Sequence, residues 1–396
     1  MKRAVSIVGA AIVTLGAAAF FARWVSRPAT PDSFYTAPTL LPQKPGMLLR
    51  QEPFVRRVPA DAIAWRILYT TTRADDSAAV ASAIVMARAS TSRPRPVVVW
   101  THGTTGVAVG CAPSLLDDPF ANVPALPALL EKGWIYVATD YVGLGTPGPH
   151  PYLIGDEEAR SALDSVRAVR QMPGVWASDQ TVVWGHSQGG NAALWTATLA
   201  PTYSPDIVIA GVVAIAPATD LTALIDAVQH TPVGRIMSSF VLRAYSERYP
   251  DVRFEDYVSG WRGVAARDMG SRCLAGAKTL FSVAEALLVS GSIFRVPPVG
   301  GALGRRLAEN TPDRTIAQPL VIAQGMADDL VIADVQSHFV ARQCSAGQSL
   351  EYWRYPGRGH LSVVSADSPL VRDLVVWTEN RFDGAQAPSG CSHLQR

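Results

Sequence analysis

Runs of apolar residues alternate with helical patterns from about residue 62, and this alternation constrains the fold more than any other feature of the sequence. Several runs are apolar without interruption, which is typical of strands that are covered by helices on both faces. Such alternation favours a mostly parallel sheet. The sequence therefore predicts an α/β fold, with strands over residues 65–72, 79–86, 97–101, 135–139, 181–185, 212–216, 320–324 and 350–355.

The segment 155–172 is a predicted helix. Ala159, Leu163 and Val166 form an apolar stripe at helical spacing. Three acidic residues lie at its beginning, where negative charge stabilises the N-terminal end of a helix.

Residues 220–315 interrupt the alternation with a long, mostly helical pattern. Extra core is one interpretation. We favour a helical cap or lid over a substrate pocket, because the insertion follows a strand end, where loops of open α/β sheets build binding sites. Residues 51–219 and 316–396 are assigned to the α/β core, and residues 220–315 to the cap.

The first 25 residues are set apart from the predicted fold. Lys2 and Arg3 precede an uncharged apolar run from Ala4 to Ala22. We favour a secretory signal peptide, with an uncleaved membrane anchor as the alternative and a buried core helix as the third interpretation. Residues 26–50 are rich in proline, and we predict an extended linker there.

Four cysteines lie downstream of the predicted export segment: Cys111, Cys273, Cys344 and Cys391. In an exported protein an even number favours disulfides, here two bonds with three possible connectivities, and four buried thiols are the alternative. None of the cysteines lies in a Cys-x-x-Cys motif or a Cys/His cluster, so the sequence gives no support to structural zinc.

The pentapeptide G-H-S-Q-G (185–189) matches G-x-S-x-G and lies between an apolar strand and a helical pattern. This strand–turn–helix context is that of a nucleophile elbow. Ser187 would lie on a strained turn with its Oγ exposed, and the backbone N–H of Gln188 would face a developing oxyanion. An ordinary serine in a glycine-rich turn is the alternative.

A serine nucleophile needs a general base. In this fold class the acid and the histidine follow the serine in the chain, which excludes His102 and His150. His186 is adjacent to Ser187, but neighbouring side chains diverge at an elbow, so we interpret it as a packed histidine. We choose His360, in a glycine-rich loop after the last predicted strand. The remaining histidines are interpreted as surface or core residues: His230, His338 and His393.

The acid is expected at the end of the strand before that, where Asp328 and Asp329 lie. We choose Asp328, which follows Gly325 in a G-x-x-D-x-x-V pattern, and interpret Asp329 as solvent-exposed or as a helix cap. Asp328 would fix the tautomer of His360 and stabilise its imidazolium.

A second oxyanion donor is expected from the loop after an early strand. The loop H-G-T-T-G (102–106) follows the strand at 97–101, and we choose the backbone N–H of Thr104, with Thr105 as the second choice. A plain glycine turn is the alternative.

Several motifs together carry a resemblance. G-H-S-Q-G-G, Q-G-M-A-D-D-L-V and G-R-G-H resemble the α/β-hydrolase superfamily. C-A-P-S (111–114) and D-Y-V-G-L-G-T-P-G-P-H-P-Y-L (140–153) resemble more specifically the secretory lipase family typified by Candida antarctica lipase A, over roughly residues 50–392. One departure is that some members carry an acidic side chain in the first oxyanion loop, where this chain has H-G-T-T-G.

The resemblance implies an α/β-hydrolase fold with a helical cap over an acyl pocket. It implies a catalytic triad of Ser187, Asp328 and His360, in agreement with the choice made from the residues alone. It also implies the disulfides Cys111–Cys273 and Cys344–Cys391.

These observations predict an exported serine hydrolase that cleaves carboxylic esters through an acyl-enzyme, as a lipase or esterase acting on a small-molecule ester or lipid. Acyl transfer is the alternative reaction, and a non-catalytic binding protein is the alternative class. We expect no cofactor and no metal. A net charge of +2 gives no field that would steer nucleic acid, whereas an apolar cap allows contact with a membrane or lipid interface.

Overall fold

The computed structural model describes residues 26–89, 93–276 and 278–396. The predicted signal peptide or membrane anchor at residues 1–25 lies outside the described residues. Within the described ranges, no helix is both long and apolar enough to cross a membrane.

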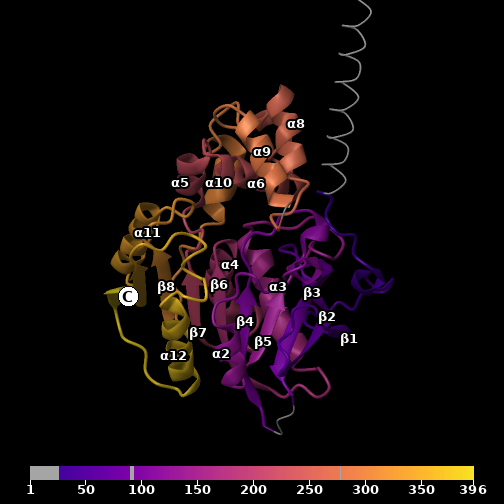
Figure 1. Ribbon diagram of the computed structural model, residues 1–396, viewed down its shortest axis with the longest axis vertical. Coiled ribbons are helices and arrows are strands. Elements are labelled where there is room, and N and C mark those ends of the chain that lie inside the picture. Colours follow the sequence, from indigo (N-terminus) through magenta and orange to yellow (C-terminus); the bar gives the residue numbers. More distant parts are fainter. Residues whose placement is uncertain (1–25, 90–92, 277) are drawn as a thin grey trace, which may run out of the picture.

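The described residues build one ten-stranded sheet in the order β1-β2-β3-β5-β4-β6-β7-β8-β9-β10 (Figure 1). Strands β1, β2, β3 and β5 pair in an antiparallel manner, and all pairs from β5 through β4 to β10 are parallel. The bounds are β1 (Leu48–Phe54), β2 (Ala62–Thr72), β3 (Ala78–Arg88), β4 (Arg95–Thr101), β5 (Ile135–Thr139), β6 (Ala177–His186), β7 (Val208–Ile215), β8 (Leu320–Gly325), β9 (Leu350–Tyr355) and β10 (Cys391–Gln395). Each predicted strand corresponds to one of these, so the mostly parallel α/β sheet is confirmed.

Central strands contribute alternate side chains to two apolar cores. In β4, Val97 and Val99 belong to one core, and Val98 and Trp100 belong to the other. Successive side chains of a strand point to opposite faces of the sheet, so a strand buried on both faces must be apolar throughout. Helices α3 (Gly155–Val169), α4 (Gln188–Tyr203) and α11 (Ala333–Ser345) contribute to the first core, and α2 (Leu126–Glu131) and α12 (Leu370–Phe382) to the second.

Helix α3 confirms the helix predicted over residues 155–172, but it ends at Val169. Pro173 and Gly174 follow shortly after, and proline disfavours the helical conformation in the residue before it. The predicted stripe of Ala159, Leu163 and Val166 is fully buried on the sheet.

The prediction of an extended linker over residues 26–50 is wrong at residues 33–35 and from residue 48 onward, where the chain forms regular structure packed on the fold. Phe34 and Tyr35, in the short 3-10 helix η1 (Ser33–Tyr35), are 3% and 1% exposed and pack on β2 and β3. The hydroxyl of Tyr35 lies 2.8 Å from the Oγ of Ser114. Strand β1 then begins at Leu48. Two buried aromatic rings bury enough apolar area to hold this proline-rich segment on the fold.

The interval between β7 and β8 is helical, and its helices form the cap at the top of Figure 1. The cap has its own apolar core around Phe240 and Tyr245, to which Tyr152 and Val331 from the loops of the α/β core also belong. The cap therefore packs on loops of the α/β core. Its helices are α5 (Leu221–Val228), α6 (Pro232–Arg248), α7 (Phe254–Tyr257), α8 (Gly260–Met269), α9 (Lys278–Leu288) and α10 (Gly301–Glu309).

Both disulfides implied by the resemblance are present. Cys111–Cys273 joins the short helix η2 (Val109–Cys111), just before η3 (Pro113–Leu115), to the segment between α8 and α9. It thus ties the cap to the core across 162 residues of sequence, and closing a loop of that length restricts the unfolded chain strongly. Cys344–Cys391 joins α11 to β10.

Candidate active site

Ser187 lies on a sharp turn between β6 and α4, with a φ of 59° that residues other than glycine adopt rarely. The flanking glycines allow this turn. A Cβ built on Gly185 would lie 2.0 Å from the carbonyl oxygen of Gly189, and one built on Gly189 would lie 1.8 Å from that of Thr101. A strained backbone of this kind costs about 1–3 kcal/mol and is found where function requires it. The turn leaves Ser187 half-buried at the end of the sheet.

The structure brings Ser187, His360 and Asp328 together in one chain of hydrogen bonds. Nε2 of His360 lies 2.9 Å from Oγ of Ser187, and Nδ1 of His360 lies 2.7 Å from Oδ2 of Asp328. A carboxylate only accepts hydrogen bonds, so Nδ1 of His360 carries the ring proton and donates to Asp328, and the lone pair of Nε2 faces the serine hydroxyl. This is the arrangement in which an imidazole removes a proton from a serine.

Asp328, and not Asp329, contacts His360. Oδ1 of Asp328 accepts hydrogen bonds from the backbone N–H groups of Leu330 and Val331, both at 2.9 Å. Its Oδ2 accepts from Nε2 of Gln324 at 3.3 Å in addition to the imidazole. Asp329 is exposed. The carboxylate of Asp328 is therefore held in one orientation toward the histidine.

His186 contacts the backbone of His360 rather than the serine oxygen. Its Nε2 lies 2.9 Å from the carbonyl oxygen of His360, so Nε2 carries a proton and donates it. The two rings are 4.7 Å apart between centroids. Burial lowers the pKa of His186 to about 3, with the nearby His360 as a second cause, and the ring is neutral. The structure thus agrees with the interpretation of His186 as a packed histidine, and adds that it supports the His360 loop.

The other histidines have different surroundings. His102 is buried against the backbone of Gly103, and burial lowers its pKa to about 4. His150 is buried beside Val142 and Gln188. The histidines that were set aside downstream are all exposed: His230, His338 and His393.

Of the two residues predicted to donate to an oxyanion, Gln188 follows Ser187 directly, and Thr104 lies in a loop that passes near it. Gln188 is the first residue of α4, so its backbone N–H has no partner within the helix. The Thr104 loop passes beside the elbow, since a Cβ built on Gly103 would lie 3.5 Å from Cβ of Ser187. The hydroxyls of Thr104 and Tyr152 are 2.8 Å apart, which holds this loop against the pocket wall. Donation by the two backbone N–H groups stays a prediction.

A mostly apolar pocket opens at Ser187 and Gln188, and its upper wall belongs to the cap. An ester whose acyl chain occupied this pocket would have its carbonyl carbon at Oγ of Ser187. The apolar side chains that line the pocket are Leu153, Ala218, Leu221, Leu224, Ile225, Val228, Met237, Val241, Leu307, Leu330 and Val331.

Two buried carboxyl groups near the site were not predicted. Asp140 follows β5 and accepts hydrogen bonds from both Ser82 and Ser114, while burial raises its pKa to about 6. Its position directly after an apolar strand was an available signal. Glu158 accepts from the side chain of Gln188 at 2.6 Å, and burial raises its pKa to about 8. In the sequence it resembles an ordinary acidic residue in the first turn of a helix.

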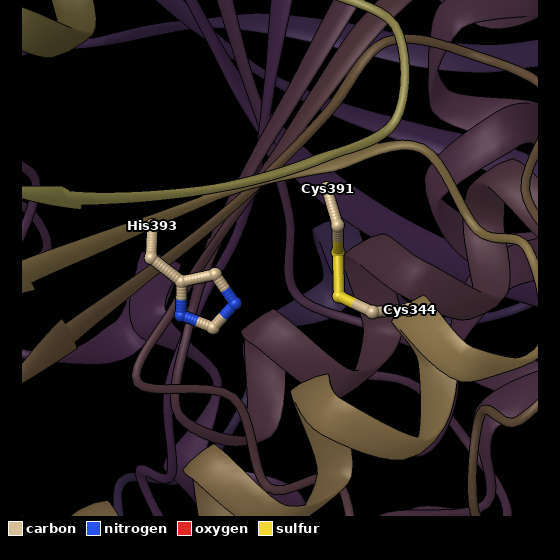
Figure 2. A group of neighbouring side chains, drawn as sticks. All are labelled: Cys344, Cys391 and His393. Carbon is tan, nitrogen blue, oxygen red and sulfur yellow. A yellow bond between two sulfur atoms is a disulfide. The ribbon is translucent and has the colours of Figure 1, made fainter.

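One group of the described residues has ligand atoms close enough for a metal ion: Cys344, Cys391 and His393, within 4.8 Å of one another. Figure 2 shows that the two sulfurs are bonded to each other, with the imidazole of His393 beside them. Zinc binds cysteine as the thiolate, which a disulfide does not provide. The residues present therefore do not fit a metal ion.

Comparison with known sequences places residues 121–390 in a match to a family model described as secretory lipase. Lipase 4 of Candida albicans is 26% identical over 291 residues, which are 68% of this chain and 60% of that protein. A secreted triacylglycerol lipase of Malassezia globosa is 26% identical over 349 residues, which are 83% of this chain and 74% of that protein. Over its matches to Lipase 4 and Lipase 5 of Candida albicans, the chain spans only 60% and 61% of those relatives' own length.

Solved structures similar to this one have an α/β-hydrolase fold, so the predicted fold class is confirmed. Candida antarctica lipase A in its closed state matches with a TM-score of 0.76 and 19% identity, over 92% of this chain and 89% of that chain. The rice cell wall degrading esterase of Xanthomonas oryzae, in a ligand-bound form, matches with a TM-score of 0.68 and 20% identity. That match covers 87% of this chain and 100% of that chain.

Proposed function

This chain belongs to the secretory lipase family, and on that premise we propose that it hydrolyses carboxylic esters through an acyl-enzyme on Ser187. One observation carries the proposal: the hydrogen bonds that run from Ser187 through His360 to Asp328 at the foot of an apolar pocket. A serine nucleophile requires a base within hydrogen-bond reach and a group that orients the base. We assign these three roles to Ser187, His360 and Asp328, in that order, on the basis of their hydrogen bonds.

In the first half of the reaction, Oγ of Ser187 attacks the ester carbonyl carbon while Nε2 of His360 takes the hydroxyl proton. Asp328 stabilises the resulting imidazolium. The negative charge on the carbonyl oxygen is received by the backbone N–H groups of Gln188 and Thr104. His360 then returns the proton to the leaving alkoxide, and the C–O bond to the alcohol breaks, which leaves the acyl group on Ser187.

In the second half, water replaces the alcohol. Nε2 of His360 removes a proton from the water as its oxygen attacks the acyl carbon. The bond to Oγ of Ser187 breaks, the serine recovers its proton, and the carboxylic acid leaves.

The substrate class is supported by the pocket wall. Apolar side chains from α5, α6 and α10 surround the space above Ser187, and burying a hydrocarbon chain there contributes about 0.8 kcal/mol per methylene. An acyl chain fits this environment better than a peptide does. The relatives named as triacylglycerol lipases support the same class.

Contact of the cap with a lipid surface is part of the proposal. Trp261 and Val264 of α8 and Leu280, Leu287 and Leu288 of α9 are all more than half exposed, and the three leucines share one face of α9 by their spacing. In Figure 1 these two helices lie at the outer end of the cap.

Vesicle flotation tests this contact. With phosphatidylcholine vesicles, the double variant Leu287→Asp/Leu288→Asp is expected to stay with the unbound protein. The control Val208→Asp changes a valine that is also more than half exposed, at the amino end of β7 and away from the cap, and it is expected to float with the vesicles. Equal flotation of the two variants would contradict the proposed contact.

Export is proposed from the basic and apolar residues 1–25 together with the two disulfides, which persist in oxidising compartments. N-terminal sequencing of the mature protein, secreted or held in the cell envelope, distinguishes a cleaved signal from a retained anchor. A reduced, full-length protein in the cytosol would contradict export.

A series of p-nitrophenyl esters from acetate to palmitate tests the proposed activity, with Ser187→Ala as the control. Wild-type turnover is expected, and Ser187→Ala is expected to lose at least about 10⁴-fold in kcat while its unfolding transition is preserved. Turnover that survives in Ser187→Ala would contradict the nucleophile. Adding excess alcohol and counting ester against free acid separates acyl transfer from hydrolysis.

A further inference from the structure

The side chain of Gln188 is anchored in a buried polar cluster behind the nucleophile. Its Nε2 donates to Oε1 of Glu158 at 2.6 Å and to Nε2 of His150 at 3.1 Å. All three side chains are almost completely buried, between α3, α4 and the loop that follows β5. The Gln188 side chain is therefore a tether on the first residue of α4.

His150 is a fixed acceptor in this cluster. Its Nδ1 lies 3.4 Å from the carbonyl oxygen of Val142, and because a carbonyl only accepts, Nδ1 carries the ring proton. Nε2 is then free to accept from Gln188. Burial lowers the pKa of His150 to about 3, so the ring stays neutral.

Glu158 is the second acceptor, and its Oε1 also receives the backbone N–H of Leu153 at 3.2 Å. Leu153 has a φ of 56° and lines the pocket. Its carbonyl oxygen accepts from the hydroxyl of Tyr245 in cap helix α6 at 2.9 Å. One oxygen of Glu158 therefore joins the nucleophile turn to a segment that carries both the pocket wall and a cap contact.

Glu158 differs in charge environment from its neighbour Glu157. Glu157 pairs with Arg73 and Arg248, whereas in residues 26–89, 93–276 and 278–396 no lysine or arginine lies within 4.0 Å of the Glu158 carboxyl. Burial raises the pKa of Glu158 to about 8, and the charge of Glu157 contributes in the same direction. The other titratable groups that face Glu158 are neutral at pH 7: His150, Tyr141, Tyr152 and Tyr245.

We propose that Glu158 is a positioning residue of the oxyanion site, which holds the backbone N–H of Gln188 beside Oγ of Ser187 through the Gln188 side chain. The proposal rests on the proposed function, because the amide has this task only in a reaction that develops an oxyanion. An oxyanion donor acts over about 2.7–3.1 Å, and a misplacement of about 1 Å can cost about 10²-fold in rate. A tether at the side chain limits rotation of the Ser187–Gln188 peptide.

Variants at both ends of the tether test this role. Glu158→Ala and Gln188→Ala each remove the hydrogen bond, and with p-nitrophenyl butyrate at pH 7 each is expected to lower kcat about 10- to 100-fold with little change in KM. Glu158→Gln keeps one acceptor oxygen and mimics the protonated carboxyl, so its kcat is expected to fall less than about fivefold, which corresponds to about one hydrogen bond.

Asp164→Ala is the matched control. Asp164 is a buried acid on the same helix, but it accepts from Tyr203 and Arg167, away from the elbow. This variant is expected to lose thermal stability and to keep kcat within about twofold, because a general loss of stability leaves the oxyanion donor in place. An equal fall of kcat in Asp164→Ala and Glu158→Ala would overturn the positioning role.

The pH profile gives a second readout. Glu158 ionises as the pH rises through about 8, and a buried anion without a cation disturbs the tether, so wild-type kcat is expected to fall on the alkaline side. Glu158→Gln is expected to lack this fall. An identical alkaline limb in both proteins would overturn the inference, whereas an inactive wild type would overturn the proposed function as well.

Discussion

Two acid–histidine pairs lie near the nucleophile turn, Asp328–His360 and Glu158–His150. In the first pair the carboxylate and the ring are in direct contact, with 2.7 Å between Oδ2 and Nδ1. In the second pair the nearest atoms are 3.9 Å apart, and the side-chain amide of Gln188 is bonded to both groups. An acid and a histidine therefore lie near Ser187 in two different arrangements.

The difference between the pairs lies in how the carboxyl oxygens are satisfied. Both oxygens of Asp328 accept hydrogen bonds, and its histidine faces the serine oxygen. Oε1 of Glu158 accepts two hydrogen bonds, while its buried Oε2 has no partner among the described residues. A buried, half-satisfied carboxyl favours its protonated form. We therefore assign proton transfer to the first pair and positioning of Gln188 to the second.

The largest effect on kcat is expected for Asp328→Asn, because this variant removes the carboxylate that contacts His360. An amide cannot fix the tautomer of His360, so kcat is expected to fall about 10⁴-fold. Asp329→Asn is expected to change kcat less than about threefold, because its exposed side chain lies outside the hydrogen-bond chain. Turnover of p-nitrophenyl butyrate measures kcat for both variants. A larger fall in Asp329→Asn than in Asp328→Asn would identify Asp329 as the acid.

His150→Phe tests the second pair from its other member. The ring volume is retained and one acceptor of the Gln188 amide is lost, so kcat is expected to fall about fivefold, equivalent to about 1 kcal/mol. A fall in kcat as large as that of Asp328→Asn would indicate that the second pair takes part in proton transfer, and would contradict different roles for the two pairs.

The smallest expected effect is on the pH dependence of thermal stability, measured as Tm. The pKa of Glu158 is raised in the folded protein, so its contribution to stability is complete below the unfolded value and is lost as the pH rises through about 8. Between pH 5 and pH 9, the Tm of the wild type is expected to fall by about 2–5 °C relative to that of Glu158→Gln. Differential scanning calorimetry measures this difference, and parallel Tm curves for the two proteins would show that Glu158 is already charged.

Much of the fold could be predicted, because its signals are local. The apolar runs of the central strands report burial on both faces, as in β4 and β6. Edge strands β1 and β10 were not predicted, since one lies in a proline-rich segment and the other is mostly exposed. The burial of Tyr35 was missed for a different reason: it packs with Leu68 and Val80, and its hydroxyl contacts Ser114, which is 79 residues away.

The hydrogen-bond chain of Ser187, His360 and Asp328 could be predicted for the same reason, whereas the contacts around it could not. Short sequence motifs contain Ser187, Asp328 and His360 and are sufficient to predict the elbow and the chain order of the three residues. The tether from Glu158 to Gln188 joins residues 30 apart, and whether an acidic residue is exposed or buried is decided by packing across helices. The bond from His186 to the carbonyl of His360 likewise spans 174 residues.

Covalent labelling with an alkyl p-nitrophenyl phosphonate shows whether Ser187 is the nucleophile and His360 its base, and mass spectrometry of the digested protein locates the modified residue. We expect one phosphonyl group on Ser187, formed at a rate that falls at least about 10³-fold in His360→Ala and less than about tenfold in His150→Phe. Labelling at another residue, or at equal rates in the two histidine variants, would contradict these roles.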